Sequence, residues 1–228
     1  MNRKRHWVLG GVLGLLLSGN VAWADSNPMQ VGARKLGVSL ESELSSRDMK
    51  VDGLNERERV ARQSVELTYG VIANLDLFAK VGLGKIAFEE ADTTSELRPL
   101  TGIGFRSTMP FWGGYFAGFS AQYLFGKVSK FEQNNATLTM EDKWTETDVR
   151  LLAGSKDMIK DPEPDLRFYA GLRFSGRTDK LPAATAKQDS SIGGIIGAAY
   201  SESKIFRFSI ELGTVDQSNI LVRFGLVF

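Results

Sequence analysis

The 228-residue sequence contains no cysteine and only one histidine, His6. Without cysteine, neither a disulfide framework nor a thiolate metal site can form. A Ser-His or Cys-His catalytic pair needs an imidazole as its base, and most zinc sites need imidazole or thiolate ligands. We therefore expect no enzymatic site, no metal and no cofactor.

Long apolar runs are equally scarce. The one candidate, residues 8–17, is shorter than the roughly 20 apolar residues that a membrane-spanning helix needs. A basic stretch at 3–5 precedes it and the small-residue motif Ala-Trp-Ala follows at 22–24, which is typical of a secretory signal peptide; a retained N-terminal anchor is the alternative. We expect cleavage after residue 24, which also removes His6, and a short periplasmic lead-in at 25–32.

The mature chain also lacks an excess of basic charge. Removing residues 1–24 leaves 25 Lys and Arg against 27 Asp and Glu, a net charge of −2. Nucleic-acid-binding proteins usually show a clear basic excess, so we expect no nucleic-acid partner. Because no apolar run is long enough for a spanning helix, a helical membrane protein is excluded. A transmembrane β-barrel or a soluble periplasmic all-β domain remains.

Strict alternation of side-chain character dominates the remaining sequence. In the last segment every second residue is apolar: Ile220, Val222, Phe224, Leu226 and Phe228. Their neighbours include Asn219, Arg223 and Gly225. Successive side chains of a strand point to opposite faces, so this segment has one apolar and one largely polar face.

The same pattern predicts ten strands, at residues 34–43, 61–71, 75–88, 100–108, 114–129, 143–154, 166–177, 190–201, 205–213 and 219–228. Eight or twelve strands would result if one hairpin were divided wrongly. Longer polar loops are expected at 45–60, 89–99, 131–142 and 178–189, and most of the other connections are short. Short periplasmic turns and longer external loops are typical of transmembrane barrels. The exceptions are a long proline-bearing segment at 155–165 and a short last loop.

An alternating strand that stops on an aromatic residue resembles the last strand of Gram-negative outer-membrane β-barrels, the small porin-like and OmpA-like proteins. The resemblance implies that Phe228, with Leu226 and Phe224, belongs to a signal read by the barrel-assembly machinery. It also implies outer-membrane lipid and lipopolysaccharide as surroundings. We therefore predict an all-β, antiparallel, up-and-down transmembrane barrel over residues 33–228, located in the outer membrane.

The alternative is a soluble periplasmic β-sandwich or a lipocalin-like barrel with its apolar faces inside. Ten continuous apolar faces would need an unusually large soluble core. The opposite faces carry glycine, serine and charges of both signs, and aromatic residues gather at the strand ends, as in the interfacial girdles of membrane barrels. These features favour the membrane barrel.

In such a barrel the polar faces line the lumen. We predict a lumenal charge network of nine basic and six acidic residues: Lys35, Glu41, Glu66, Asp76, Lys80, Arg106, Glu146, Asp148, Arg150, Arg167, Arg173, Arg177, Arg207, Glu211 and Arg223. Interleaved charges of both signs favour an ion-pair network that plugs the lumen, with a structural or interaction role and external loops available to a protein partner. The alternative is a narrow, weakly anion-preferring pore for ions or small solutes.

Two groups of acidic residues allow a functional interpretation. Glu146 and Asp148 lie two apart on one strand face and could serve acid–base chemistry. Salt bridges to Arg150, Arg167 or Arg173 are the simpler interpretation. The loop acids Glu89, Glu90, Asp92 and Glu96 could hold divalent cations between lipopolysaccharide phosphates, or form a solvated loop.

Overall fold

The computed structural model describes residues 30–51, 53–89, 92–133, 136–159, 164–180, 185–188, 192–202, 205–214 and 217–228. The predicted signal peptide at 1–24 and most of the lead-in lie outside these residues. The elements are β1 (Leu36–Val51), β2 (Leu54–Ile72), β3 (Leu75–Phe88), β4 (Thr93–Ser95), β5 (Arg98–Pro110), the 3-10 turn η3 (Trp112–Gly114), β6 (Phe116–Gln133), β7 (Ala136–Gly154), β8 (Asp165–Lys180), β9 (Thr185–Gln188), β10 (Ile192–Ser201), β11 (Phe206–Thr214) and β12 (Gln217–Val227).

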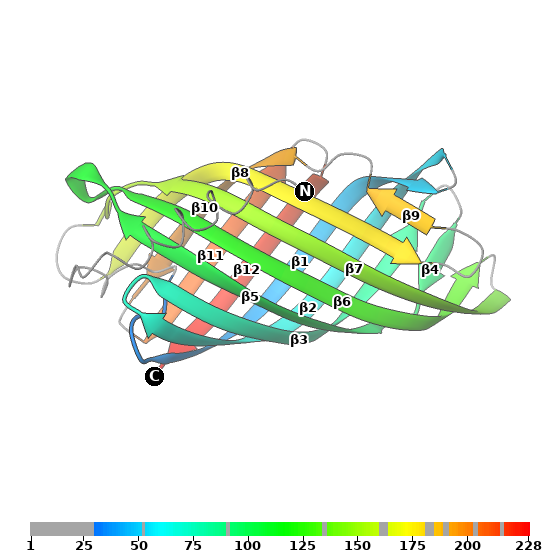
Figure 1. Ribbon diagram of the computed structural model, residues 1–228, viewed down its shortest axis with the longest axis horizontal. Helices are drawn as coiled ribbons and strands as arrows, with labels where there is room; N and C mark the ends of the chain where they lie inside the picture. Colours follow the sequence, from blue (N-terminus) through cyan, green and yellow to red (C-terminus); the bar gives the residue numbers. More distant parts are fainter. Residues whose placement is uncertain are drawn as a thin grey trace, which may run out of the picture.

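These segments form one closed antiparallel barrel with ten strand positions (Figure 1). β4 and β5 both pair with β3 and β6, so they share one position. β9 and β10 both pair with β8 and share another. β1 closes the ring by pairing with β12 from Gly37↔Val227 to Arg47↔Gln217. The predicted fold class, up-and-down topology and strand number are confirmed.

The two ends of the barrel differ. The start of β1 and the end of β12 lie at one end, on the left in Figure 1, which we call the proximal end. We call the other end the distal end. There β9 pairs with both β8 and β1, beyond the ends of the shorter strands β10, β11 and β12. No helix in the described part of the chain is long and apolar enough to cross a membrane.

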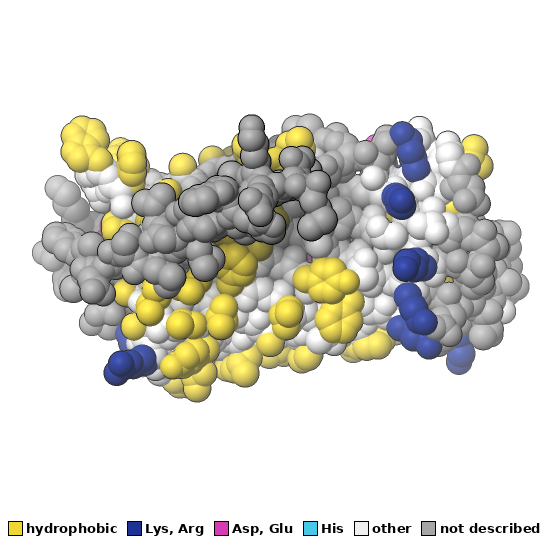
Figure 2. Space-filling view, in the orientation of Figure 1, with side chains coloured by type: hydrophobic (Ala, Val, Ile, Leu, Met, Phe, Trp, Pro, Cys, Tyr) yellow, Lys and Arg dark blue, Asp and Glu magenta, His cyan; other side chains and the backbone are white. Residues whose placement is uncertain are grey.

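The apolar face of each strand points outward. On β1 the exposed fractions are 49% for Leu36, 62% for Leu40 and 58% for Leu44, whereas Glu41 and Glu43 between them are buried. Exposed apolar side chains cover much of the wall as a band (Figure 2). The lipocalin-like alternative, in which the apolar faces point inward, is therefore wrong.

Two of the predicted loops are strands instead. β1 runs to Val51 and β2 starts at Leu54, so most of 45–60 is a paired hairpin. Likewise β6 runs to Gln133 and β7 starts at Ala136, within the predicted loop at 131–142. On β1 the outward side chains beyond the apolar band are Ser46, Asp48 and Lys50, so the alternation of hydrophobicity ends there while the backbone pairing continues.

The other two loops are interrupted by short strands. β4 lies within 89–99, and β5 already begins at Arg98. β8 runs to Lys180, and β9 occupies part of 178–189; residues 181–184 and 189–191 lie outside the described chain. The expectation for 155–165 holds, because β7 ends at Gly154 and β8 begins at Asp165.

Candidate functional site

The interior of the barrel contains a cluster of arginines around one carboxylate, which we call the distal cluster: Glu146 with Arg47, Arg62, Arg173 and Arg177. Arg62 Nη2 lies 3.0 Å from Glu146 Oε1, and Arg47 Nη2 lies 3.2 Å from Oε2. Arg177 and Arg173 approach the same carboxylate at 3.5 and 3.8 Å. The side chains of Glu146, Arg47 and Arg177 are completely buried.

Three further acids surround this cluster. Glu58 lies 2.8 Å from Arg177, and Glu43 lies 3.0 Å from Arg62. Asp179 lies 3.2 Å from Arg177. Buried charges are tolerated only when they are paired and hydrogen-bonded, and here each guanidinium faces more than one carboxylate.

A second set of ion pairs follows at mid-barrel. Asp148 lies 2.6 Å from Arg173, which connects it to the distal cluster, and 3.0 Å from Arg150. Arg150 then reaches Glu211 at 2.7 Å. The Tyr169 hydroxyl donates a hydrogen bond to Glu211 at 3.4 Å. The charges thus form a continuous chain across β7, β8 and β11.

A third set lies nearer the proximal end. Lys80 Nζ lies 2.6 Å from Glu41 and 3.2 Å from Glu66. Arg106 forms an ion pair with Glu66, and Arg223 forms one with Glu41. Because β12 supplies Arg223 and β1 supplies Glu41, this pair also bridges the strands that close the ring.

Apolar side chains add to the filling on either side of these ions. Leu100, Leu124 and Trp144 form one buried cluster. The Arg177 guanidinium lies over the Trp144 ring, 4.7 Å from its centroid. This arrangement gives the cation a favourable partner on its apolar side.

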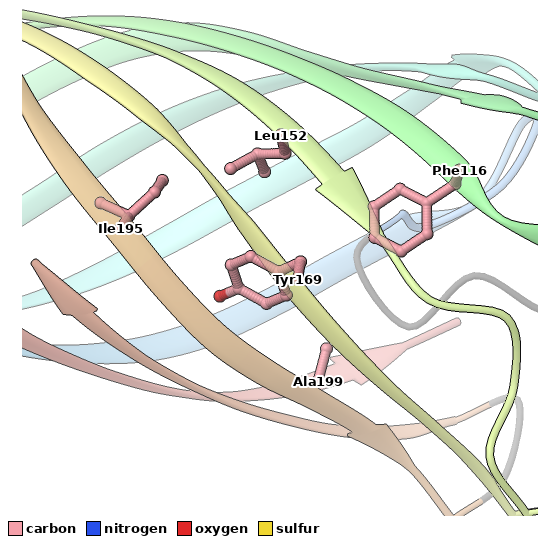
Figure 3. Packing of buried hydrophobic residues seen from close by; sticks show 5 residues of the cluster. All are labelled: Phe116, Leu152, Tyr169, Ile195 and Ala199. Atoms are coloured by element: carbon pink, nitrogen blue, oxygen red, sulfur yellow. The ribbon is translucent and has the colours of Figure 1, made fainter.

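A second apolar cluster is drawn in Figure 3 and comprises Phe116, Leu152, Tyr169, Ile195 and Ala199. Its rings fit because glycines lie opposite them: Gly154 is the cross-strand partner of Phe116, and Gly197 is that of Tyr169. A Cβ atom at either glycine would collide with the facing ring. Glycine thus allows aromatic rings to lie against the barrel wall.

The segment before β1 folds into the proximal end. The backbone N–H of Val31 donates a hydrogen bond to Asp76 at 2.9 Å, and Thr108 donates one to the side chain of Gln30. Gln30 and Val31 are 1% and 8% exposed. This segment therefore belongs to the filling of the barrel.

Described residues line two small cavities in the interior, of about 40 and 50 Å³. They adjoin each other, since Arg106, Ser209 and Arg223 line both. A water molecule needs roughly 10–15 Å³ of such space, so each cavity can hold only a few waters.

Most of the predicted charge residues take part in these contacts. Members of the three sets are Glu41, Glu66, Lys80, Arg106, Glu146, Asp148, Arg150, Arg173, Arg177, Glu211 and Arg223. Asp76 binds the Val31 backbone instead. Arg167 pairs with Asp165 at 3.0 Å at the proximal end, half-buried Arg207 lines the smaller cavity, and Lys35 precedes β1.

Sequence reasoning missed five members of the network: Glu43, Arg47, Glu58, Arg62 and Asp179. Three of them lie in segments interpreted as loops. The period-2 pattern itself could have found them, because Ser45, Arg47 and Met49 continue the inward face of β1 and are all buried. Asp165 and Arg98 are also buried. With these two and the missed residues included, the basic excess inside the barrel is smaller than in the predicted set of nine basic and six acidic residues.

Three of the four loop acids, Glu89, Asp92 and Glu96, lie in the described part of the chain and form no metal-binding group there. Glu89 forms an ion pair with Arg59, and Glu90 lies outside the described residues. Among the residues that the structure describes, no group of three acidic, histidine or cysteine side chains has a metal-binding arrangement.

The residues of the predicted assembly signal share the outward face at the proximal end. Phe224, Leu226 and Phe228 are 49%, 45% and 70% exposed. The Phe228 backbone exchanges two hydrogen bonds with Leu36, of 2.7 and 3.2 Å. The last residue is therefore part of the seam between the first and last strands.

No protein-family model matches the chain, and no similar sequence was found among curated proteins. Among solved structures it is similar to the translocator domain of the autotransporter NalP from Neisseria meningitidis, with a TM-score of 0.49, 12% identity, and coverage of 98% of this chain and 95% of that one. It is also similar to an outer-membrane channel from Pseudomonas putida F1, with a TM-score of 0.44 and 12% identity; the match covers 92% of this chain and 100% of that one. The β domain of the Bordetella autotransporter BrkA is similar with a TM-score of 0.46 and 10% identity; the match covers 84% of this chain and 98% of that one. These structural neighbours are outer-membrane β-barrels.

Proposed function

We propose that this protein is an integral barrel of the outer membrane whose lumen is closed, and that it acts as a structural or interaction protein. The outward apolar band supports the membrane location. On β3 it extends from Leu75 to Leu83, with Leu77, Val81 and Leu83 each at least 50% exposed. Nine residues in a strand tilted by about 40° span roughly 20–25 Å, close to the apolar height of outer-membrane barrels.

The distal cluster is the observation that carries the proposal of a closed lumen. Arg47 on β1 and Arg62 on β2 meet Glu146 on β7, although neither strand is paired with β7. The ion pairs therefore cross the interior instead of lining its wall. Buried residues of the apolar clusters and the segment before β1 fill the space on both sides.

A closed barrel leaves its distal rim as the part that can meet a partner. β1 and β2 continue beyond the apolar band as a paired hairpin, and so do β6 and β7. We propose that a protein partner binds these paired hairpins. The barrel-assembly machinery is the proposed partner of the terminal strand.

We also propose that the protein has no enzymatic role. The Glu146 and Asp148 carboxylates, which could have formed an acid–base pair, are each held by arginines at 2.6–3.2 Å. The arginine guanidinium groups thus contact the carboxylate oxygens that an acid–base pair would need.

A narrow pore is the second candidate, and the two adjoining cavities favour it. They adjoin at Arg106 and Arg223, on the proximal side of the distal cluster. Rearrangement of the arginines around Glu146 would be needed to extend the cavities into a path through the barrel.

Single-channel recording of the refolded mature protein in planar bilayers tests the proposal. We expect a silent membrane, with folding verified by heat-modifiable gel migration. Discrete openings of constant size would contradict the closed lumen. In that case Arg167→Glu, at the proximal end, should reduce any preference for anions, whereas Lys156→Gln in the exposed turn after β7 should leave the preference unchanged.

A further inference from the structure

The smaller interior cavity, at the proximal end of the barrel, is lined by two residues with unused hydrogen-bond donors. Gln30 is 1% exposed, and its Nε2 group has no hydrogen-bond partner in the described part of the chain. The same holds for the Nε group of Arg106, although the Nη2 group of this residue binds Glu66. Both residues line the cavity, which has a volume of about 40 Å³. Since buried donors are normally hydrogen-bonded, we expect a ligand with acceptor capacity in this cavity.

Contacts with the barrel wall hold both donor side chains in place. The Thr108 hydroxyl donates a hydrogen bond to Gln30 Oε1, which fixes the amide group. The Arg106 guanidinium lies over the Phe78 ring, 4.7 Å from its centroid, while its Nη2 group is held by Glu66. A ligand that accepts hydrogen bonds from these residues therefore meets side chains that are already ordered, which lowers the entropic cost of binding.

The charges around the cavity favour an anion over water. The charged residues that line it are three arginines and one glutamate: Arg106, Arg207, Arg223 and Glu66. Lys80 and Glu41 pair with members of this set, and Asp76 lies directly opposite Arg106 on the paired strand. The group then contains four basic and three acidic residues. A buried charge without a counter-charge is destabilising, and a monovalent anion would both balance the group and accept the unused hydrogen bonds.

The second cavity, of about 50 Å³, has a more balanced surrounding. It adjoins the first at Arg106, Ser209 and Arg223. Its additional arginine, Arg150, is already matched by Glu211 at 2.7 Å and by Asp148 at 3.0 Å. The unmatched positive charge therefore belongs to the proximal cavity. This cavity has room for a few water molecules, so it can take a chloride ion, which is only slightly larger than water, but not an organic phosphate.

We propose that the proximal cavity binds one small monovalent inorganic anion of the size of chloride. Arg106 Nε and Gln30 Nε2 donate hydrogen bonds to it, and the guanidinium groups of Arg207 and Arg223 contribute the surrounding positive potential. Gln30 precedes β1, whereas Arg106 and Arg223 belong to β5 and β12, so the anion connects the segment before β1 to the barrel wall. The site depends neither on the membrane location nor on whether the lumen conducts.

A urea titration of the mature barrel in lipid vesicles, with sodium chloride replaced stepwise by sodium gluconate at constant ionic strength, tests this site. Gluconate is too large for the cavity, so the screening of charges stays the same while the ligand is withdrawn. An anion that binds only the folded state lowers the unfolding equilibrium constant by the factor 1 + [chloride]/Kd. Well above Kd, each tenfold rise in chloride should therefore lower this constant about tenfold.

Two substitutions remove one donor each and leave the charge unchanged. Gln30→Met removes the amide, and Arg106→Lys replaces the guanidinium and its Nε–H by an ammonium group. Each should weaken chloride binding about tenfold or more, as expected for a lost hydrogen bond to a charged group. Lys156→Gln is the control, since it removes a positive charge from the exposed turn after β7, outside both cavities, and should keep the chloride dependence of the wild type.

Bromide provides a second readout that needs neither unfolding nor a variant. A crystal of the folded barrel grown in sodium bromide should show an anomalous-scattering peak beside Arg106 and Gln30, and this measurement decides the question if the variants fail to fold by gel migration. Equal unfolding constants in chloride and gluconate would overturn the proposal, and so would an unchanged chloride dependence in both donor variants. A bromide peak without chloride dependence in solution would indicate an adventitious ion only, which also overturns it. A conducting barrel that keeps the chloride dependence would contradict only the closed lumen.

Discussion

Neutralising Glu146 is the sharpest test of the ion-pair network. Its carboxylate is fully buried and is shared by four arginines at 3.0–3.8 Å. Glu146→Gln keeps the shape of the side chain and removes its charge. Removing one partner of a buried ion pair typically costs about 3–5 kcal/mol, because the remaining charge stays buried without compensation.

The carboxylates that remain near the arginines determine where in this range the loss of unfolding free energy lies. After the substitution Arg177 still has Glu58 at 2.8 Å, Arg62 has Glu43 at 3.0 Å, and Arg173 keeps a short contact to Asp148. No arginine is left without any anion, so we expect the loss in unfolding free energy to lie near the lower end, about 3 kcal/mol.

The measurement is a urea titration of the barrel folded in lipid vesicles, followed by tryptophan fluorescence and heat-modifiable migration. Glu89→Gln is the matched control, since Glu89 pairs with Arg59, whose side chain is 68% exposed, and such pairs contribute at most about 1 kcal/mol. The double variant Glu146→Gln/Arg47→Met restores the charge balance. Its loss should be smaller than the sum of the two single losses by at least about 1 kcal/mol.

The reasoning would be refuted if Glu146→Gln were as stable as Glu89→Gln, or if the losses of the two single variants simply added. Either result would mean that water or mobile ions, and not the opposing side chains, neutralise these charges. The closed lumen would then lose its main support.

Two further substitutions test the aromatic–glycine packing and the membrane-facing wall. Gly154→Ala places a methyl group against the Phe116 ring and should lower the unfolding free energy by about 1–3 kcal/mol in the same titration. Adding Phe116→Leu should recover part of this loss. A Gly154→Ala variant as stable as the wild type would contradict the packing. Ile103 lies in the apolar band and is 61% exposed. If it faces lipid, Ile103→Arg should lower the unfolding free energy by about 2–4 kcal/mol. The matched Ile103→Ala change should cost less, and a neutral Ile103→Arg variant would argue against the membrane location.

The sequence predicted most of the charged residues of the interior, but few of their partners; the contacts of Asp148 with Arg150 and Arg173 are the exception. Arg62 and Glu146 are 84 positions apart and lie on strands that do not pair, so no spacing in the sequence connects them. Their contact depends on the curvature and closure of the sheet. Arg47 and Glu58 were missed because the polar outer positions around them suggested loops.

The amino-acid sequence by itself determined the barrel class, the number of strand positions and, within the predicted strands, which side chains face inward. The physical reason is local: side chains alternate along a strand, so the order of residues alone assigns each to one face. Only the tertiary structure decided where the strands end, which acid meets which arginine, and that ion pairs cross the lumen. These features depend on the register between strands and on closure of the ring, which bring distant residues together in a space too narrow to leave them apart.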